Sequence, residues 1–195
     1  MESVIKKLLF YGIAIMLTGC VPSLHRLYVD DNDLVFDEKL LGDFHSKDPD
    51  WLWSFEKGSS KDKEYEMTII DEDKKPGKFD VHLVKIDEMR FLDLYPADRP
   101  DSAESGFYQG HFMPIHTFMK IELSQPNISL NFMDGEKVEK MIENDPNIIK
   151  HEFVDKTLVL TASPKELQQF MRDYANDPNV FTKPCELLRI TDPNK

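Results

Sequence analysis

The fold of this chain is decided by a series of short runs that begins with Trp51-Leu52-Trp53-Ser54-Phe55-Glu56. Residues 65–70 and 78–86 form the next two runs, and all three are rich in the aromatic and β-branched residues that favour strands. Turn-forming residues separate the runs, in Gly58-Ser59-Ser60 and in Lys75-Pro76-Gly77. Short strands with tight turns between them predict antiparallel neighbours rather than a parallel sheet with crossover helices.

Similar runs lie on either side of this series. They cover residues 40–46, 89–95, 112–123, 128–133, 158–161 and 186–191. A long polar loop, residues 97–110, lies between the second and the third of them. The regular spacing predicts a mainly β domain, built either as an antiparallel barrel or as a β-sandwich.

Two helices are predicted between residues 133 and 186. Asp134 can cap a short helix that runs to about Asn144. For the second, longer helix, Ser163 at the N-cap and Glu166 three residues later form a capping box. The apolar residues that follow recur at three- and four-residue spacing and predict a core-facing stripe: Leu167, Phe170, Met171 and Tyr174.

The order of a meander, a helix and a closing strand resembles lipocalin-like barrels. Those barrels begin with a Gly-x-Trp element and end with a helix packed outside the barrel before a final strand. Here Gly42-Asp43-Phe44 stands at the first element, with Phe in the place of Trp. The resemblance covers residues 40–191 and implies an eight-stranded antiparallel barrel, about wide enough to hold one small ligand.

The N-terminus resembles the leader of a bacterial lipoprotein precursor. Lys6 and Lys7 precede an apolar run of about ten residues, whereas a membrane-spanning helix needs about 20. The run ends in Leu17-Thr18-Gly19-Cys20, which is similar to the lipobox of these precursors. The resemblance implies cleavage before Cys20 and lipidation of its thiol. An uncleaved N-terminal anchor and an ordinary secretory signal are the alternatives.

This leader divides the chain into three parts. Residues 1–19 are predicted as a signal peptide, 20–39 as the lipidated cysteine with a tether, and 40–195 as a single domain. Leu34-Val35-Phe36 within the tether is apolar enough to dock on the domain. Val21 replaces the Asp that tends to mark retention at the inner membrane. In a Gram-negative source this favours the periplasmic side of the outer membrane.

The charge and the missing motifs limit the function. A net charge of −12 argues against binding to nucleic acid, because phosphates repel an acidic surface. The sequence has no Gly-x-Ser-x-Gly or His-Glu-x-x-His motif and no glycine-rich phosphate loop. We therefore expect no cofactor, no metal site and no enzymatic activity.

Two tryptophans and one carboxylate are the first candidates for a pocket lining. Trp51 and Trp53 share one strand face, which predicts either core residues or an aromatic lining for an apolar ligand. Asp93 lies between two aromatic residues of the same strand face. It is interpreted either as a carboxylate in the barrel lumen that orients a ligand, or as a structural carboxylate held by backbone amides or by an arginine such as Arg189.

His116 completes this speculative ligand-binding set. It shares a strand face with Phe112, Pro114 and Phe118, which suggests either a pocket wall or a structural histidine with satisfied hydrogen bonds. His111 falls on the opposite face, so the two histidines do not form a metal pair.

The leading interpretation is a membrane-anchored envelope lipoprotein whose barrel binds a small apolar or amphipathic ligand. The alternative is a filled barrel that acts as an interaction module, with its acidic surface or the loop 97–110 binding another envelope protein. A hydrolase would instead need Asp93 or a histidine beside a serine, a threonine or a second carboxylate. A lumen cavity of about 300 Å³ or more would favour the first interpretation over the second.

Overall fold

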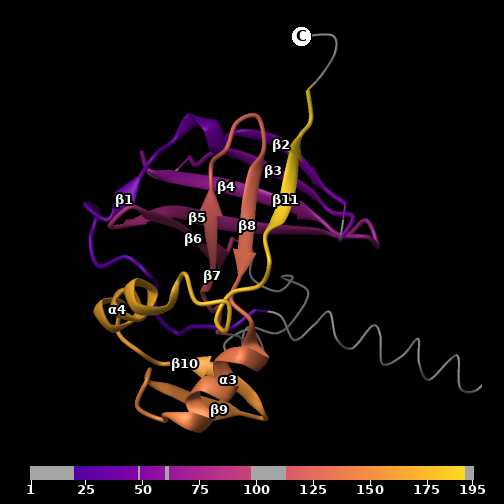
Figure 1. Ribbon diagram of the computed structural model, residues 1–195. Coiled ribbons are helices and arrows are strands. Elements are labelled where there is room, and N and C mark those ends of the chain that lie inside the picture. The colour runs from indigo at the N-terminus through magenta and orange to yellow at the C-terminus, as the bar shows by residue number, and fades with distance from the viewer. Residues whose placement is uncertain (1–19, 48, 60–61, 98–112, 192–195) are drawn as a thin grey trace, which may run out of the picture.

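The computed structural model describes residues 20–47, 49–59, 62–97 and 113–191, and eight of its strands form a closed antiparallel barrel (Figure 1). In chain order these strands are β2 (Gly42–Ser46), β3 (Leu52–Lys57), β4 (Glu64–Ile70), β5 (Pro76–Ile86), β6 (Met89–Pro96), β7 (Thr117–Glu122), β8 (Ile128–Phe132) and β11 (Cys185–Arg189). Each of the first seven pairs with the next along the chain, and β11 pairs with both β8 and β2. The predicted mainly β, lipocalin-like barrel is confirmed, and closure of the sheet excludes the β-sandwich.

Strand alternation divides the side chains between the barrel interior and its outer face. On β5, Leu83 belongs to the cluster of buried residues inside the barrel, and its neighbour Val84 belongs to a second buried cluster outside it. On β6, Leu92 points inward and Phe91 outward in the same way. One set of strands therefore supports two apolar cores.

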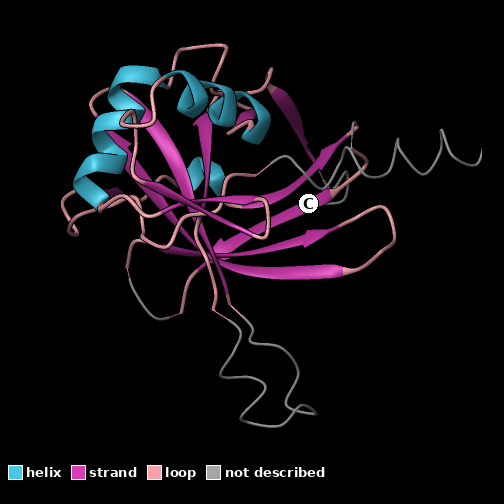
Figure 2. Cartoon of the chain, turned by 90° about the horizontal axis from the view of Figure 1, so that it is seen from below, coloured by secondary structure: helices cyan, strands magenta, loops and turns pink. Residues whose placement is uncertain are grey.

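The outer core is covered by an insertion between β8 and β11. It contains α3 (Gly135–Asn144), β9 (His151–Val154), β10 (Thr157–Leu160) and α4 (Pro164–Tyr174). Both predicted helices are present, whereas β9, which pairs with β10 as a hairpin, was not predicted. Most of the helical segments lie along one side of the strands (Figure 2).

The start of α4 follows the predicted capping box. The backbone N–H and the hydroxyl of Ser163 both donate to the Glu166 carboxylate, at 2.8 and 2.7 Å. Leu167, Phe170 and Met171 are buried in the outer core, which agrees with the predicted stripe. Local chemistry starts this helix and apolar burial holds it in place.

The segment predicted as a tether is part of the domain. Val21, Ser23 and Leu27 are buried, and β1 (Leu34–Val35) pairs with β5. The boundary expected at residue 40 is therefore wrong, although the docking of Leu34 and Val35 was anticipated. The error arose because the acidic run at residues 30–33 has the composition of a linker, whereas the burial of its neighbours depends on contacts distant in sequence.

Arg189 ties the last strand of the barrel to the first. Its guanidinium donates to the backbone carbonyls of Lys39, Leu41 and Pro126, and it lies 4.4 Å from the ring centroid of the buried Phe44. Gly42 has a φ of +119°, and a Cβ there would stand 2.6 Å from Arg189 Nη1. The backbone conformation therefore favours glycine at this position, and a Cβ would also displace the Arg189 guanidinium.

Replacement of Arg189 should weaken barrel closure. Arg189→Met keeps an apolar stem over Phe44 but leaves three carbonyls without their donor, so we expect the free energy of unfolding to fall by about 1.5–3 kcal/mol. Chemical denaturation measures this change. Lys165→Met, which removes an exposed cation from α4, is the control and should change it by less than about 0.5 kcal/mol. Equal stability of the two variants would contradict this account of closure.

Candidate functional site

The barrel interior is occupied by fifteen buried apolar side chains. Trp53 is 1% exposed, and its indole N–H donates to Ser46 Oγ at 3.3 Å. Trp51 is half-buried, with its ring centroid 5.9 Å from that of Trp53. Both tryptophans therefore pack with the interior core, and Trp53 has its polar atom satisfied within it.

Asp93 lies on the outer face of the barrel. Its carboxylate is 1% exposed; Oδ2 accepts a 2.7 Å bond from the Leu27 backbone N–H, and Oδ1 lies 2.7 Å from His116 Nδ1. His116 is held in turn by two backbone hydrogen bonds with Ser23, of 2.8 and 2.9 Å, and its ring centroid is 4.7 Å from that of Tyr95. The pair fastens the N-terminal segment, residues 21–28, to β6 and to the start of β7.

The expectation that these four residues line one pocket is therefore wrong. Trp51 and Trp53 pack with the interior core, whereas Asp93 and His116 lie outside it beneath the N-terminal segment. The contacts of Asp93 agree with the second of its two interpretations, because a backbone amide, that of Leu27, holds the carboxylate; its second partner is His116 rather than Arg189. The alternation on β6 was predicted correctly; what the sequence left open is which of the two strand faces points into the barrel.

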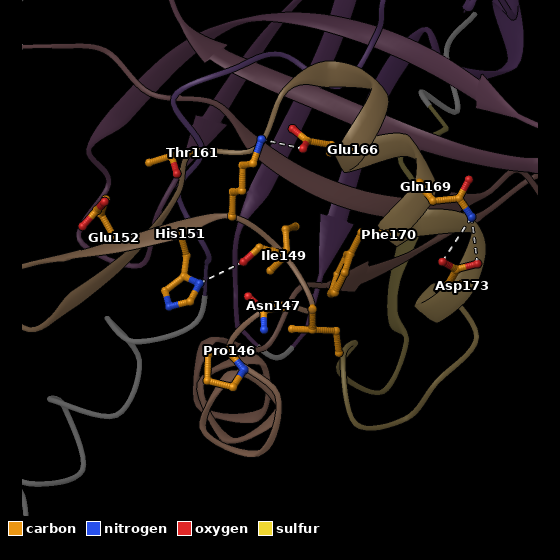
Figure 3. A pocket seen from close by; sticks show the side chains of 12 residues that line it. Pro146, Asn147, Ile149, His151, Glu152, Thr161, Glu166, Gln169, Phe170 and Asp173 are labelled. Atoms are coloured by element: carbon orange, nitrogen blue, oxygen red, sulfur yellow. Dashed lines mark hydrogen bonds and ion pairs between the residues drawn. The ribbon is translucent and has the colours of Figure 1, made fainter.

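A cleft of about 570 Å³ lies within the insertion, and we call it the α4 cleft (Figure 3). Residues 146–152 form one side of it, and Thr161 and α4 form the other. Phe170 and Ile149, which are buried, supply apolar surface, and the rim is charged. The cleft therefore combines a small apolar floor with a mainly polar and charged lining.

The rim of the α4 cleft is electrostatically asymmetric. Lys150 Nζ lies 2.7 Å from Glu166 Oε1, so these two charges compensate each other. Gln169 Nε2 donates to both carboxylate oxygens of Asp173, at 3.0 and 3.1 Å. Asp173 and Glu152 are left without a cationic partner among the described residues, and the cleft therefore favours a cationic group.

Hydrogen bonds set the protonation of Glu166. Bonds from Lys150, and from the hydroxyl and backbone N–H of Ser163, lower the pKa of the Glu166 carboxyl to about 2. The carboxylate is thus the form that caps α4 and holds Lys150 across the cleft at any pH well above this value.

A second cavity of about 610 Å³ lies between β1 and the turn from β3 to β4. Leu34 is the one apolar side chain in its described lining, and Lys63 Nζ crosses it to donate to the carbonyls of Asp31 and Leu34, both at 2.8 Å. The buried His82 also lines this cavity, and its Nε2 lies 3.5 Å from Glu64 Oε2. This cavity lacks the apolar floor of the α4 cleft.

Searches for other kinds of site were negative for the part of the chain that the structure describes. No cluster of three or more His, Cys, Asp or Glu side chains able to hold a metal ion occurs there. Within the same ranges no helix is long and apolar enough to cross a bilayer. His111 and most of the loop 97–110 lie outside the described residues.

Comparison with known proteins gave no match. Protein-family models, curated proteins and solved structures were each compared with this chain, and none of the three comparisons found a similar protein.

The α4 cleft was not predicted from the sequence, because its outer wall includes β9. A hairpin signal was present: two runs with strand-forming residues, His151–Val154 and Thr157–Leu160, flank the two residues Asp155 and Lys156. Three of the four β9 residues are exposed, so the strand lacks the regular apolar alternation that marks a half-buried strand.

Loss of the Asp93 carboxylate should release the N-terminal segment. Asp93→Ala leaves the buried Leu27 N–H without an acceptor, and we expect the free energy of unfolding to fall by about 2–5 kcal/mol. Trypsin cleavage after the exposed Arg26 should accelerate as well. Asp43→Ala removes an exposed carboxylate that accepts a bond from Ser54 and is the control. Equal stability and equal cleavage rates of the two variants would show that Asp93 does not hold the N-terminal segment in place.

The low pKa of Glu166 predicts a defined acid sensitivity of α4. The folded-state pKa lies below the usual 4.5, so the stabilisation from this carboxylate is complete above pH 4.5 and is lost as the pH falls through about 2. The difference in unfolding free energy between wild type and Glu166→Gln should therefore be constant above pH 4.5 and shrink below it. Urea unfolding between pH 6 and pH 2 measures this difference; a pH-independent difference would contradict the assignment.

Proposed function

We propose that the protein is a lipid-anchored, non-enzymatic binding protein of the bacterial envelope. In this proposal the barrel is a scaffold, and the insertion between β8 and β11 carries the ligand site in the α4 cleft. The ligand is a small amphipathic molecule with an apolar body and a cationic head. In a Gram-negative cell the protein resides on the periplasmic side of the outer membrane.

The proposed anchor is supported by the leader and by the position of Cys20. The leader ends in Leu17-Thr18-Gly19-Cys20 behind two lysines and a short apolar run. Cys20 is exposed at the start of the described chain, and Val21 immediately after it is buried. Acyl chains on this thiol would extend away from a residue that is itself fixed to the domain.

The buried side chains inside the barrel favour a ligand site outside the lumen. Fifteen buried apolar side chains, with Trp53 among them, occupy the space that a ligand inside the barrel would need. A ligand there would have to displace well-packed side chains at a cost of several kcal/mol. A site outside the barrel avoids this cost.

The α4 cleft is the single observation that carries the proposed ligand. Its volume of about 570 Å³ falls within the usual range for small-molecule sites, which is roughly 300–1,000 Å³. Phe170 and Ile149 offer apolar contact for the body of the ligand, and Asp173 and Glu152 attract a cationic head. Because Lys150 is already paired with Glu166, an anionic head gains less at this rim.

A second candidate function is an interaction module of the cell envelope. The filled barrel favours it, because a domain without a lumen site can still present its acidic outer surface to another envelope protein. Most of the loop 97–110 assigned to this contact lies outside the described residues. A chain that binds no amphiphile in the α4 cleft would favour this second function.

The anchor is tested by the mass of the mature protein. Expressed as the full chain in a bacterium that processes lipoproteins, it should begin at Cys20, carry acyl chains and sediment with membranes. Cys20→Ser should lack the acyl mass and leave the membrane fraction, and Cys185→Ser should behave as wild type. Intact-protein mass spectrometry reads the outcome; a wild-type chain without acyl mass would refute the anchor.

The ligand site is tested with two amphiphiles of equal chain length. Dodecylamine should bind the full chain more tightly than dodecanoate, by roughly tenfold if the head gains about 1.4 kcal/mol from the acidic rim. Gln169→Trp places a large ring in the cleft and should abolish binding. Lys165→Trp, on the same helix but outside the cleft, is the matched control. Calorimetry below the micelle concentration measures both; binding that survives Gln169→Trp would exclude the cleft.

A further inference from the structure

The hairpin formed by β9 and β10 ends in an apolar tip. Phe153 and Val154 are 51% and 58% exposed, among the most exposed large hydrophobic residues described. Asp155 and Lys156 join the strands with positive φ values of 48° and 71°, as in a two-residue hairpin turn. Consecutive strand residues point to opposite faces, so Phe153 and Val154 make both faces of the ribbon apolar near its end.

The start of the described chain lies beside this tip. Leu160 N–H donates to Pro22 O at 2.8 Å, and Leu24 N–H donates to Leu160 O at 2.9 Å, so Ser23 and Leu160 form a parallel bridge. Continued three residues back along both chains, this register sets Cys20 level with Thr157. The two residues also line one small cavity of about 150 Å³. Thr157 pairs with Val154, so Cys20 is level with the last residue pair of the hairpin.

We propose that Phe153 and Val154 insert into the lipid surface next to the acyl chains of Cys20 and orient the domain on the membrane. This inference rests on the proposed lipidation of Cys20. Acyl chains on that thiol place the hairpin tip at the bilayer surface. Amphipathic helices that lie in the interface bury their apolar face about 5–10 Å deep, which gives the depth to be reached here. A strand rises about 3.3 Å per residue, so the last two residues of β9 and the turn span this depth.

The charges around the tip indicate apolar insertion rather than attraction to anionic lipid. Glu152 and Asp155 outnumber Lys156 in and next to the turn, so the local charge does not favour an anionic surface. Added salt should therefore not weaken the contact. His151 and Glu152 belong to both β9 and the wall of the α4 cleft, so this orientation brings the cleft close to the lipid headgroups.

Depth-dependent quenching tests the orientation in the full, acylated chain. Val154→Cys and Ile190→Cys, each with Cys185→Ser, are labelled with a nitrobenzoxadiazole dye and reconstituted into vesicles of phosphatidylethanolamine and phosphatidylglycerol. Ile190 is 48% exposed and follows the end of β11 that points away from the hairpin, so it is a matched control (Figure 1). Thr157→Cys, opposite Val154, is a second probe at the tip.

The dye at residues 154 and 157 should be quenched several-fold more than the dye at residue 190 by lipids that carry a nitroxide on the acyl chain. This difference should persist in high salt. Equal quenching at all three positions, in protein whose mass shows acylated Cys20, would overturn the orientation and leave the anchor intact. A chain without acyl mass would overturn the anchor and this inference together.

Discussion

Closure of the barrel by β11 is the constraint on which the rest of the structure depends. The strand returns after about fifty residues of insertion to pair with β8 on one side and β2 on the other. Without it, both flanking strands would expose unpaired backbone groups at a sheet edge. Arg189 strengthens the return, because one side chain binds three carbonyls from two other parts of the chain. These hydrogen bonds help to offset the entropy lost in closing the long connection between β8 and β11.

Because the barrel is closed, its strands contribute side chains to two separate cores. The interior core lies within the barrel, and the outer core joins β5, β6 and β7 to the insertion and to the N-terminal segment. Asp93 lies within this outer layer, where water is excluded and each of its oxygens has a partner. As a result the start of the described chain, the β9–β10 hairpin and the α4 cleft are held against one side of a rigid scaffold.

The features that sequence reasoning predicted correctly depend on neighbours along the chain. The capping box at Ser163 and Glu166 lies within four residues, and the strands around Trp53 are marked by local composition and by the turns between them. The features that sequence reasoning missed either depend on residues far apart in the chain or have a weak local pattern. Leu27 is buried against a carboxylate 66 residues away, so nothing near it in the sequence distinguishes it from a tether. The strand β9 is exposed on most of its length, so its apolar pattern is weak.

The sequence by itself determined the mainly β class, the number and order of most strands, and both helices. These follow from side-chain periodicity, turn chemistry and caps, which act over a few residues. Only the tertiary structure decided which face of β6 points inward, and thereby that Asp93 and His116 fasten the N-terminal segment instead of lining a lumen. The tertiary structure alone also brought Cys20 level with the hairpin tip and formed the α4 cleft. Strand alternation assigns side chains to two faces of a strand, but it does not indicate which face points into the barrel. Only closure of the barrel decides this.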